Sequence, residues 1–180
     1  MVILSIVAAA LLFAADAASK TWADQELRRD GARSVAGGLV VLRYQSNSGI
    51  AFALFRAPIV AWKRPALIAY SSAVTVGLTA LLARRSVRRL RRRQPIGKDA
   101  SPSAKSAWLV DAGLLALLVG SAGNLRDRIV RGAVVDFLAL RSPWSDALSP
   151  AFNLADAYLA VGVGLCLAGM WTTRRQTASP

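Results

Sequence analysis

Two aspartates stand beside long apolar runs in the C-terminal third of the chain. Asp136 lies in the sequence Val-Val-Asp-Phe, and Asp156 lies in Phe-Asn-Leu-Ala-Asp. A carboxylate at the edge of lipid is costly, so such a residue usually has a function. Two neighbouring carboxylates cannot easily both ionise, so one can activate water as a base while the other polarises a carbonyl group as an acid. The pair therefore predicts peptide hydrolysis at a membrane.

Further polar residues lie where a membrane protein normally uses Leu and Val. Three of them share one helix face at the end of an apolar run: Asn124, Asp127 and Arg128. Asn153 precedes Asp156 by three residues and shares its face, so we expect Asn153 to orient the substrate or the aspartates. Asp127 could instead form an ion pair with Arg131 at i+4, and both interpretations of Asp127 remain open.

Composition excludes several other classes of hydrolase. The chain has 180 residues, of which 54% are hydrophobic, and a formal charge of +13, which suits a small bundle of membrane helices. It contains no His, the usual base of serine and cysteine hydrolases and the commonest zinc ligand. Its one cysteine, Cys166, cannot form an internal disulfide. We expect neither a metal nor another cofactor.

Four apolar runs define the expected organisation of residues 1–180 as a single integral membrane domain. Each run approaches the roughly 20 residues that cross about 30 Å of hydrocarbon. We place the spans at residues 2–18, 66–83, 107–125 and 151–171. Between and after them lie an outer loop at 19–65, a basic cytoplasmic loop at 84–106, an outer catalytic loop at 126–150 and a cytoplasmic tail at 172–180. The first run could also be a signal peptide, although it lacks the Lys or Arg that normally begins one.

Basic residues predict the orientation of these spans. The densest positive cluster lies at residues 84–93, between the second and third spans, and positive loops usually stay in the cytoplasm. This orientation brings four aspartates to the outer membrane face: Asp16, Asp127, Asp136 and Asp156. A basic run could also bind nucleic acid, but between two spans it is explained by topology and by affinity for anionic lipid. We therefore expect no nucleic-acid partner.

The outer loop is too long to be a bare connection. Residues 38–44 are β-prone, residues 45–49 carry a turn signal, and residues 50–55 are again β-prone. We expect a small antiparallel sheet on the outer membrane surface, where it could present main-chain hydrogen bonds to an extended peptide. The expected fold is thus an all-α membrane protein of four transmembrane helices, with a small extracytoplasmic β-sheet between the first two.

Five short boxes resemble, in order, those of the lipoprotein signal peptidases, also called signal peptidase II. They cover nearly the whole chain: Asp16-x-x-x-Lys20, Asn47-x-Gly49-x-Ala-Phe, Gly-Asn-x-x-Asp-Arg at 123–128, Gly132 before Val-Val-Asp-Phe at 134–137, and Phe-Asn-x-Ala-Asp at 152–156. The resemblance implies that Asp136 and Asp156 are the catalytic pair. It implies substrate-binding or supporting roles for eight others: Asn47, Gly49, Asn124, Asp127, Arg128, Asn153, Asp16 and Lys20. The chain departs from the family in having Ile50 where Ala is customary.

This resemblance also implies a substrate and a place in the cell. The expected activity is aspartic endopeptidase cleavage that removes the signal peptide from diacylglyceryl-modified prolipoproteins, just before the lipidated Cys. We expect a monomer in contact with membrane lipid, in the bacterial cytoplasmic (inner) membrane, with its active site on the extracytoplasmic side. Alternatives are a catalytically idle relative that binds lipopeptides or antibiotics, and a small ion-coupled transporter that uses Asp16 and Asp156. We interpret Asp16 and Lys20, at i,i+4, as a helix-terminal ion pair.

Overall fold

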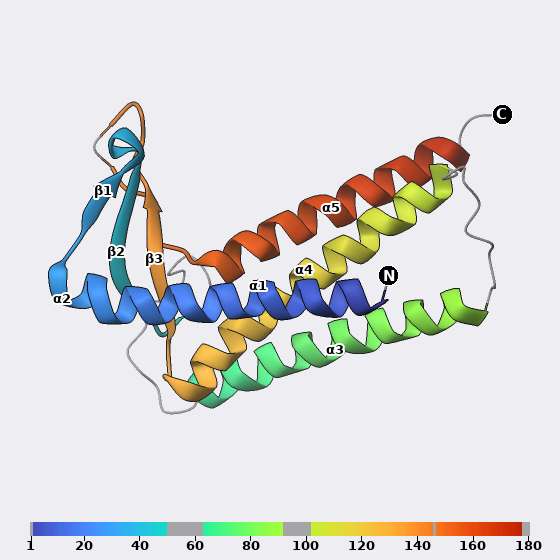
Figure 1. Ribbon diagram of the computed structural model, residues 1–180, viewed down its shortest axis with the longest axis horizontal. Coiled ribbons are helices and arrows are strands. Elements are labelled where there is room, and N and C mark those ends of the chain that lie inside the picture. The colour runs from blue at the N-terminus through green and yellow to red at the C-terminus, as the bar shows by residue number, and fades with distance from the viewer. Residues whose placement is uncertain (1, 50–62, 92–101, 146, 178–180) are drawn as a thin grey trace.

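Four long helices run side by side, and a small sheet lies at one end of them (Figure 1). The computed structural model describes residues 2–49, 63–91, 102–145 and 147–177. The long helices are α1 (Val2–Trp22), α3 (Lys63–Arg91), α4 (Pro102–Val130) and α5 (Leu154–Thr177). Within the described residues, four helices are long and apolar enough to cross a membrane, which confirms the expected fold class.

The first helix continues well past the predicted span at 2–18. After α1 the chain passes through a π-helical turn, η1 (Ala23–Leu27), and a final turn, α2 (Arg28–Asp30). Residues 2–30 contain neither Gly nor Pro, so nothing in the sequence interrupts the helix where its hydropathy falls. It ends at Gly31, whose φ of 86° favours glycine. The helix thus extends beyond the stretch that its apolar residues define.

The last helix begins three residues later than the predicted span at 151–171. Phe152 is paired with Leu138 across an isolated antiparallel bridge, so the chain is still extended there. Helix α5 then begins at Leu154, and Asp156 lies in its first turn. Helix α4 packs most extensively against α5, because glycines allow their backbones to approach. A Cβ atom on Gly113 would lie only 2.7 Å from the carbonyl oxygen of Gly162.

A three-stranded antiparallel sheet has the order β1 (Arg33–Val35), β2 (Val40–Asn47) and β3 (Val134–Leu140). Strand β2 contains most of the predicted strand at 38–44, whereas the second predicted strand, at 50–55, lies outside the described residues. The third strand comes instead from the predicted catalytic loop at 126–150. Most of β3 is buried, so its sequence lacks the alternation of a half-exposed strand. This is why sequence reasoning took it for a loop.

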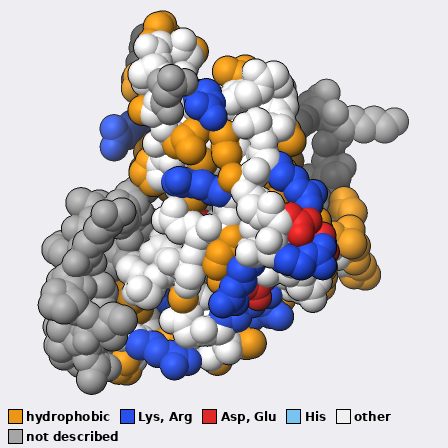
Figure 2. Space-filling model, turned by 90° about the vertical axis from the view of Figure 1, so that its left-hand side faces the viewer, with side chains coloured by type: hydrophobic (Ala, Val, Ile, Leu, Met, Phe, Trp, Pro, Cys, Tyr) orange, Lys and Arg blue, Asp and Glu red, His pale blue; other side chains and the backbone are white. Residues whose placement is uncertain are grey.

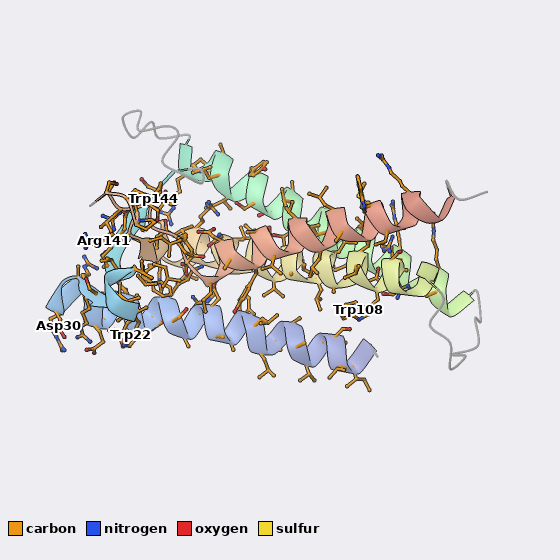
Figure 3. The ribbon with its side chains drawn as sticks, turned by 90° about the horizontal axis from the view of Figure 1, so that it is seen from above. Trp22, Asp30, Trp108, Arg141 and Trp144 are labelled. Carbon is orange, nitrogen blue, oxygen red and sulfur yellow. The ribbon has the colours of Figure 1, made fainter. Side chains whose placement is uncertain are left out.

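A small apolar core joins the sheet to the end of the first helix. Its four buried members are Ala23, Leu27, Val135 and Phe137. Trp22 packs edge-on against Phe137, with ring centroids 6.4 Å apart. Trp22 and Trp144 lie at the sheet end, whereas Trp108 lies toward the opposite end (Figure 3), a pattern typical of aromatic belts at two membrane interfaces. This core fixes β3, and with it Asp136, over the helix ends.

Candidate active site

Backbone pairing brings the two aspartates to the same place. Asp136 lies on β3, and Phe152 exchanges two backbone hydrogen bonds of 2.8 Å with Leu138 on the same strand. The next residues start α5, so Asp156 comes to lie beside β3. Asp136 is 1% exposed, and its charge interacts with that of Asp156. The structure thus brings together the two residues that the sequence singled out as a pair.

Asn153 joins these two aspartates through one side chain. Its Oδ1 accepts the backbone N–H of Asp156 at 3.0 Å, while Asp156 Oδ2 accepts the backbone N–H of Asn153 at 3.3 Å. This reciprocal pattern is a capping box at the N-terminus of α5. Because the cap fixes Oδ1, the Nδ2 of Asn153 is turned toward Asp136 and donates to its Oδ1 at 2.7 Å. A helix cap therefore sets the relative position of both carboxyl groups.

Asn47 holds the other oxygen of Asp136. Its Nδ2 donates to Asp136 Oδ2 at 2.9 Å, and its Oδ1 accepts the backbone N–H of Gly49 at 3.0 Å. This local turn fixes the orientation of the amide, so the donor must face the carboxyl group. The pKa of Asp136 is raised to about 6, chiefly because burial disfavours the charged form; the bonds from Asn47 and Asn153 oppose this rise, and negative charge on Asp156 adds to it. Asp136 can therefore hold or release a proton near neutral pH.

Asn124 performs the matching task for Asp156. Its Nδ2 donates to Asp156 Oδ1 at 2.7 Å, and its Oδ1 accepts the Lys20 ammonium at 2.9 Å. Lysine has only donors, so it dictates which end of the amide faces it. The Asn124 donor must then face Asp156. Each carboxyl group is thus held by an amide whose orientation another group has fixed.

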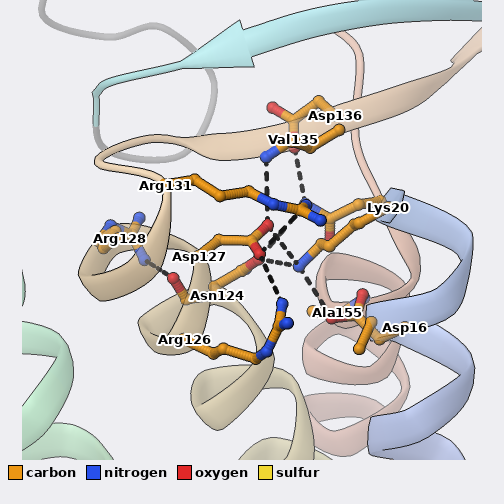
Figure 4. Close-up of polar contacts among 12 residues, drawn as sticks. Asp16, Lys20, Asn124, Arg126, Asp127, Arg128, Arg131, Val135, Asp136 and Ala155 are labelled. Carbon is orange, nitrogen blue, oxygen red and sulfur yellow. Dashed lines mark hydrogen bonds and ion pairs between the residues drawn. The ribbon is translucent and has the colours of Figure 1, made fainter. Parts of the chain in front are cut away.

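Beneath these amides lies a buried ion cluster (Figure 4). Lys20 is 0% exposed, and its ammonium lies 2.9 Å from Asp16 Oδ2 and 3.5 Å from Asp127 Oδ2. With Asn124 these are three acceptors for its three N–H groups. Asp16 also accepts the backbone N–H of Ala155 at 2.9 Å. The pair at i,i+4 is thus confirmed, and it anchors α1 to the start of α5.

Asp127 contacts cations and backbone within the described residues. Arg131 lies 3.4 Å from its Oδ1, so the ion pair at i+4 is present. Its Oδ2 accepts the backbone N–H of Val135 at 3.3 Å, one residue before Asp136. Arg131 also donates to Thr21 Oγ1 at 2.9 Å. These contacts favour a role for Asp127 in placing β3.

Arg128 points to a different side of α4 from Asp127, so the expectation that Asn124, Asp127 and Arg128 share one face does not hold for Arg128. In Figure 4 it projects away from Lys20, and one of its N–H groups donates to the carbonyl oxygen of Asn124 at 3.3 Å. Its charge interacts with both Asp136 and Asp156. Position 123 on the same helix requires glycine, because a Cβ atom there would lie 2.5 Å from Asp16 Oδ2.

All ten residues that the sequence indicated gather at the sheet end of the bundle. The rest of the second box, residues 50–52, lies outside the described residues. Sequence reasoning missed one contributor, Thr21, which accepts a hydrogen bond from Arg131 and gave no signal in the sequence. No group of three His, Cys, Asp or Glu side chains that could hold a metal ion occurs in the part of the chain that the structure describes.

Comparison with known proteins finds relatives that belong to one family. A family model described as signal peptidase (SPase) II matches residues 8–172. A lipoprotein signal peptidase of Solibacter usitatus is 29% identical over 171 residues, covering 95% of this chain and 92% of the relative. Those of Shewanella woodyi and Dichelobacter nodosus are each 32% identical; they cover 87% and 86% of this chain, and 77% and 85% of their own sequences.

Solved structures share the fold. A bacterial membrane enzyme solved by the in meso method at 2.3 Å resolution has a TM-score of 0.74 and 19% identity, and the match covers 100% of this chain and 94% of that one. A second, at 1.9 Å resolution, has a TM-score of 0.68 and 20% identity, and the match covers 94% of each chain. At these identities the likeness concerns the fold alone.

Proposed function

Because the chain belongs to the signal peptidase II family, we propose that it is a membrane aspartic endopeptidase that removes the signal peptide from diacylglyceryl-modified prolipoproteins, with Asp136 and Asp156 as its catalytic pair. The observation that carries this proposal is the Asn153 side chain, which caps the helix of Asp156 and donates to Asp136 at 2.7 Å. Such an arrangement holds two carboxyl groups at a fixed separation. It requires no metal ion for hydrolysis.

The two carboxyl groups differ in ways that suggest their roles. Asp156 lies in the first turn of α5, where the helix dipole stabilises negative charge, and the Arg128 charge acts in the same direction. Asp156 is therefore suited to be the base that removes a proton from water. Asp136, whose pKa is raised to about 6 mainly by burial, is suited to be the acid that polarises the scissile carbonyl.

The supporting residues act by positioning Asp136 and Asp156. Asn47 and Asn153 hold Asp136, and Asn124 holds Asp156. Lys20, which is buried with Asp16 and Asp127, fixes the amide of Asn124 and joins α1 to α4 under the site, and Asp16 extends this link to α5 through the backbone N–H of Ala155. Gly49 fixes Asn47 through its backbone N–H.

The distribution of basic residues supports a membrane side for the active site. The catalytic pair is at the sheet end, and the Arg-rich C-terminal end of α3 is at the opposite end of the bundle (Figure 1). Because positive segments tend to stay in the cytoplasm, this separation supports an extracytoplasmic active site in the bacterial inner membrane. We further propose that the enzyme acts as a monomer on a substrate anchored in the surrounding lipid.

Lipid dependence of cleavage tests the proposed function. Each CH₂ of the substrate's acyl chains that stays in the bilayer contributes about 0.8 kcal/mol, so the lipid can hold the scissile bond at the depth of the two aspartates. Purified protein should cleave a diacylglyceryl-modified prolipoprotein and leave the unmodified precursor almost intact, with or without EDTA. Equal cleavage of both substrates would contradict the lipid-anchored substrate, and inhibition by EDTA would contradict the metal-free pair.

A further inference from the structure

A cavity of about 190 Å³ lies beside Asn47, the residue that holds Asp136, where the start of α3, the end of α4 and the end of β2 meet. Its lining residues are Asn47, Ser48, Arg64, Leu67, Arg128, Gly132 and Ala133. Pockets for whole drug-sized ligands measure roughly 300 to 1,000 Å³. This smaller cavity therefore fits an end group of a larger molecule rather than a whole ligand.

Two arginines of the cavity differ from others at this end of the molecule. Arg28, Arg33 and Arg131 each lie within 3.5 Å of a carboxylate oxygen. Neither Arg64 nor Arg128 forms an ion pair with a described residue; Arg128 donates to the neutral carbonyl oxygen of Asn124, and its charge interacts with those of Asp136 and Asp156 without direct contact. At the sheet end of the molecule, basic side chains cover more of the visible surface than acidic ones (Figure 2). The cavity thus presents two guanidinium groups that can accept an anion.

Gly132 provides the surface on which Arg64 rests. Its φ of 80° favours glycine, and a Cβ there would lie 3.3 Å from Arg64 Cζ. The same glycine precedes the strand of Asp136. The guanidinium group of Arg64 therefore lies against the turn that leads to the catalytic strand.

Hydrolysis creates an anion next to this cavity. Water adds its oxygen to the carbonyl carbon and the C–N bond breaks, which leaves a carboxylate on the signal peptide and an ammonium group on the mature protein. The new carboxylate is repelled by the acidic pair. Asn47 separates the pair from the cavity, because it donates to Asp136 at 2.9 Å and also lines the cavity. This cationic cavity is thus one side chain away from the reaction.

We propose that this cavity binds the new C-terminal carboxylate of the cleaved signal peptide, with Arg64 and Arg128 as its ligands. Guanidinium groups bind carboxylates through paired, charge-assisted hydrogen bonds. Leu67, one turn along α3 from Arg64, offers an apolar wall to the adjoining side chain. The inference rests on the proposed function, and it predicts that the enzyme is inhibited by one of its own products.

Inhibition by matched peptides tests this site. We would prepare one signal peptide ending at the cleavage site, both as the free acid and as the C-terminal amide, and measure inhibition of lipoprotein cleavage in a neutral detergent without phospholipid. Because Arg64 is exposed, we expect the acid to inhibit about tenfold better than the amide in the wild type, the lower end for a charge-assisted bond. Arg64→Gln should remove most of this preference. Arg33→Gln, which changes an exposed arginine of β1 that does not line the cavity, should retain it.

The outcomes separate this inference from the proposed function. If the wild type cleaves the lipidated substrate but the acid and amide inhibit equally, the carboxylate site is wrong and the peptidase assignment stands. If the wild type does not cleave that substrate at all, the proposed function fails first. If Arg64→Gln keeps the acid preference while its melting temperature matches the wild type, Arg64 is not a ligand. If added phosphatidylglycerol abolishes the preference, the cavity belongs to a lipid phosphate and the inference is overturned.

Discussion

Replacing Asn153 by Ser should separate the two tasks of this side chain. A serine hydroxyl can accept the backbone N–H of Asp156, so Asn153→Ser keeps the cap of α5. The serine side chain is too short to reach Asp136 Oδ1, to which the Asn153 amide donates at 2.7 Å. The variant therefore removes one hydrogen bond to Asp136 with little change in helix stability.

The size of the effect follows from the charge on Asp136. A hydrogen bond to a charged group contributes about 1.5 to 3 kcal/mol, and one pKa unit corresponds to about 1.4 kcal/mol. The bond from Asn153 lowers the pKa of Asp136, so its loss must raise that pKa. Because Asp136 is 1% exposed, solvent does not screen this effect. From its present value of about 6, the pKa should rise by about one to two units.

The pH dependence of kcat/KM would report this change. If Asp136 is the acid, activity is lost as pH rises through its pKa, and the basic limb of the Asn153→Ser profile should move up by about one to two units. Asn153→Ala should show the same shift and also lose about 1 kcal/mol of stability with the cap. A basic limb that coincides with that of the wild type would refute the reasoning, and movement of the acid limb instead would make Asp136 the base.

Three further changes test the supporting structure. Lys20→Met should lower the free energy of unfolding by about 3 to 5 kcal/mol, because it leaves Asp16 in a buried cluster without its cation, and equal melting temperatures would contradict this. Gly123→Ala should cost about 1 to 3 kcal/mol by crowding Asp16 Oδ2, whereas Gly164→Ala, with no atom within 4 Å of its Cβ position, should cost nothing. The pKa of Asp136 is raised on folding from 3.8 to about 6, so the unfolded chain releases this proton at lower pH than the folded one, and the wild type should lose about 2 kcal/mol of stability as pH rises from 4 to 7. Melting of Asp136→Asn in detergent should lack this loss, and a parallel pH dependence in both proteins would contradict the assignment.

Much of the site could be predicted because its residues lie in short local patterns. The Asp16 and Lys20 pair follows from i,i+4 spacing on one helix, and Asn153 with Asp156 follows from i,i+3 spacing at a helix start. Hydropathy located the four helices but not their ends, because a helix continues until a residue such as Gly31 interrupts it, whatever the thickness of the membrane.

Contacts between distant residues could not be predicted in this way. Lys20 and Asn124 are separated by 104 positions, and no local spacing reports that they meet. Strand β3 was missed because its partner, β2, lies about ninety residues earlier and because both faces of β3 are covered. Arg64 and Gly132 are likewise far apart in the sequence, so the cavity that they line is visible only in the folded chain.

The central claim is that Asp136 and Asp156 together cleave the peptide bond. Its most direct test is the rate of cleavage of a lipid-modified prolipoprotein by purified wild type, Asp136→Asn and Asp156→Asn, with Asp24→Asn as a control. Asp24 is partly exposed and paired with the exposed Arg28, away from the two catalytic aspartates, so its variant should match the wild type. We predict that each of the two catalytic variants loses nearly all turnover while remaining folded, because the reaction needs one acid and one base. Wild-type cleavage by either catalytic variant would contradict the claim.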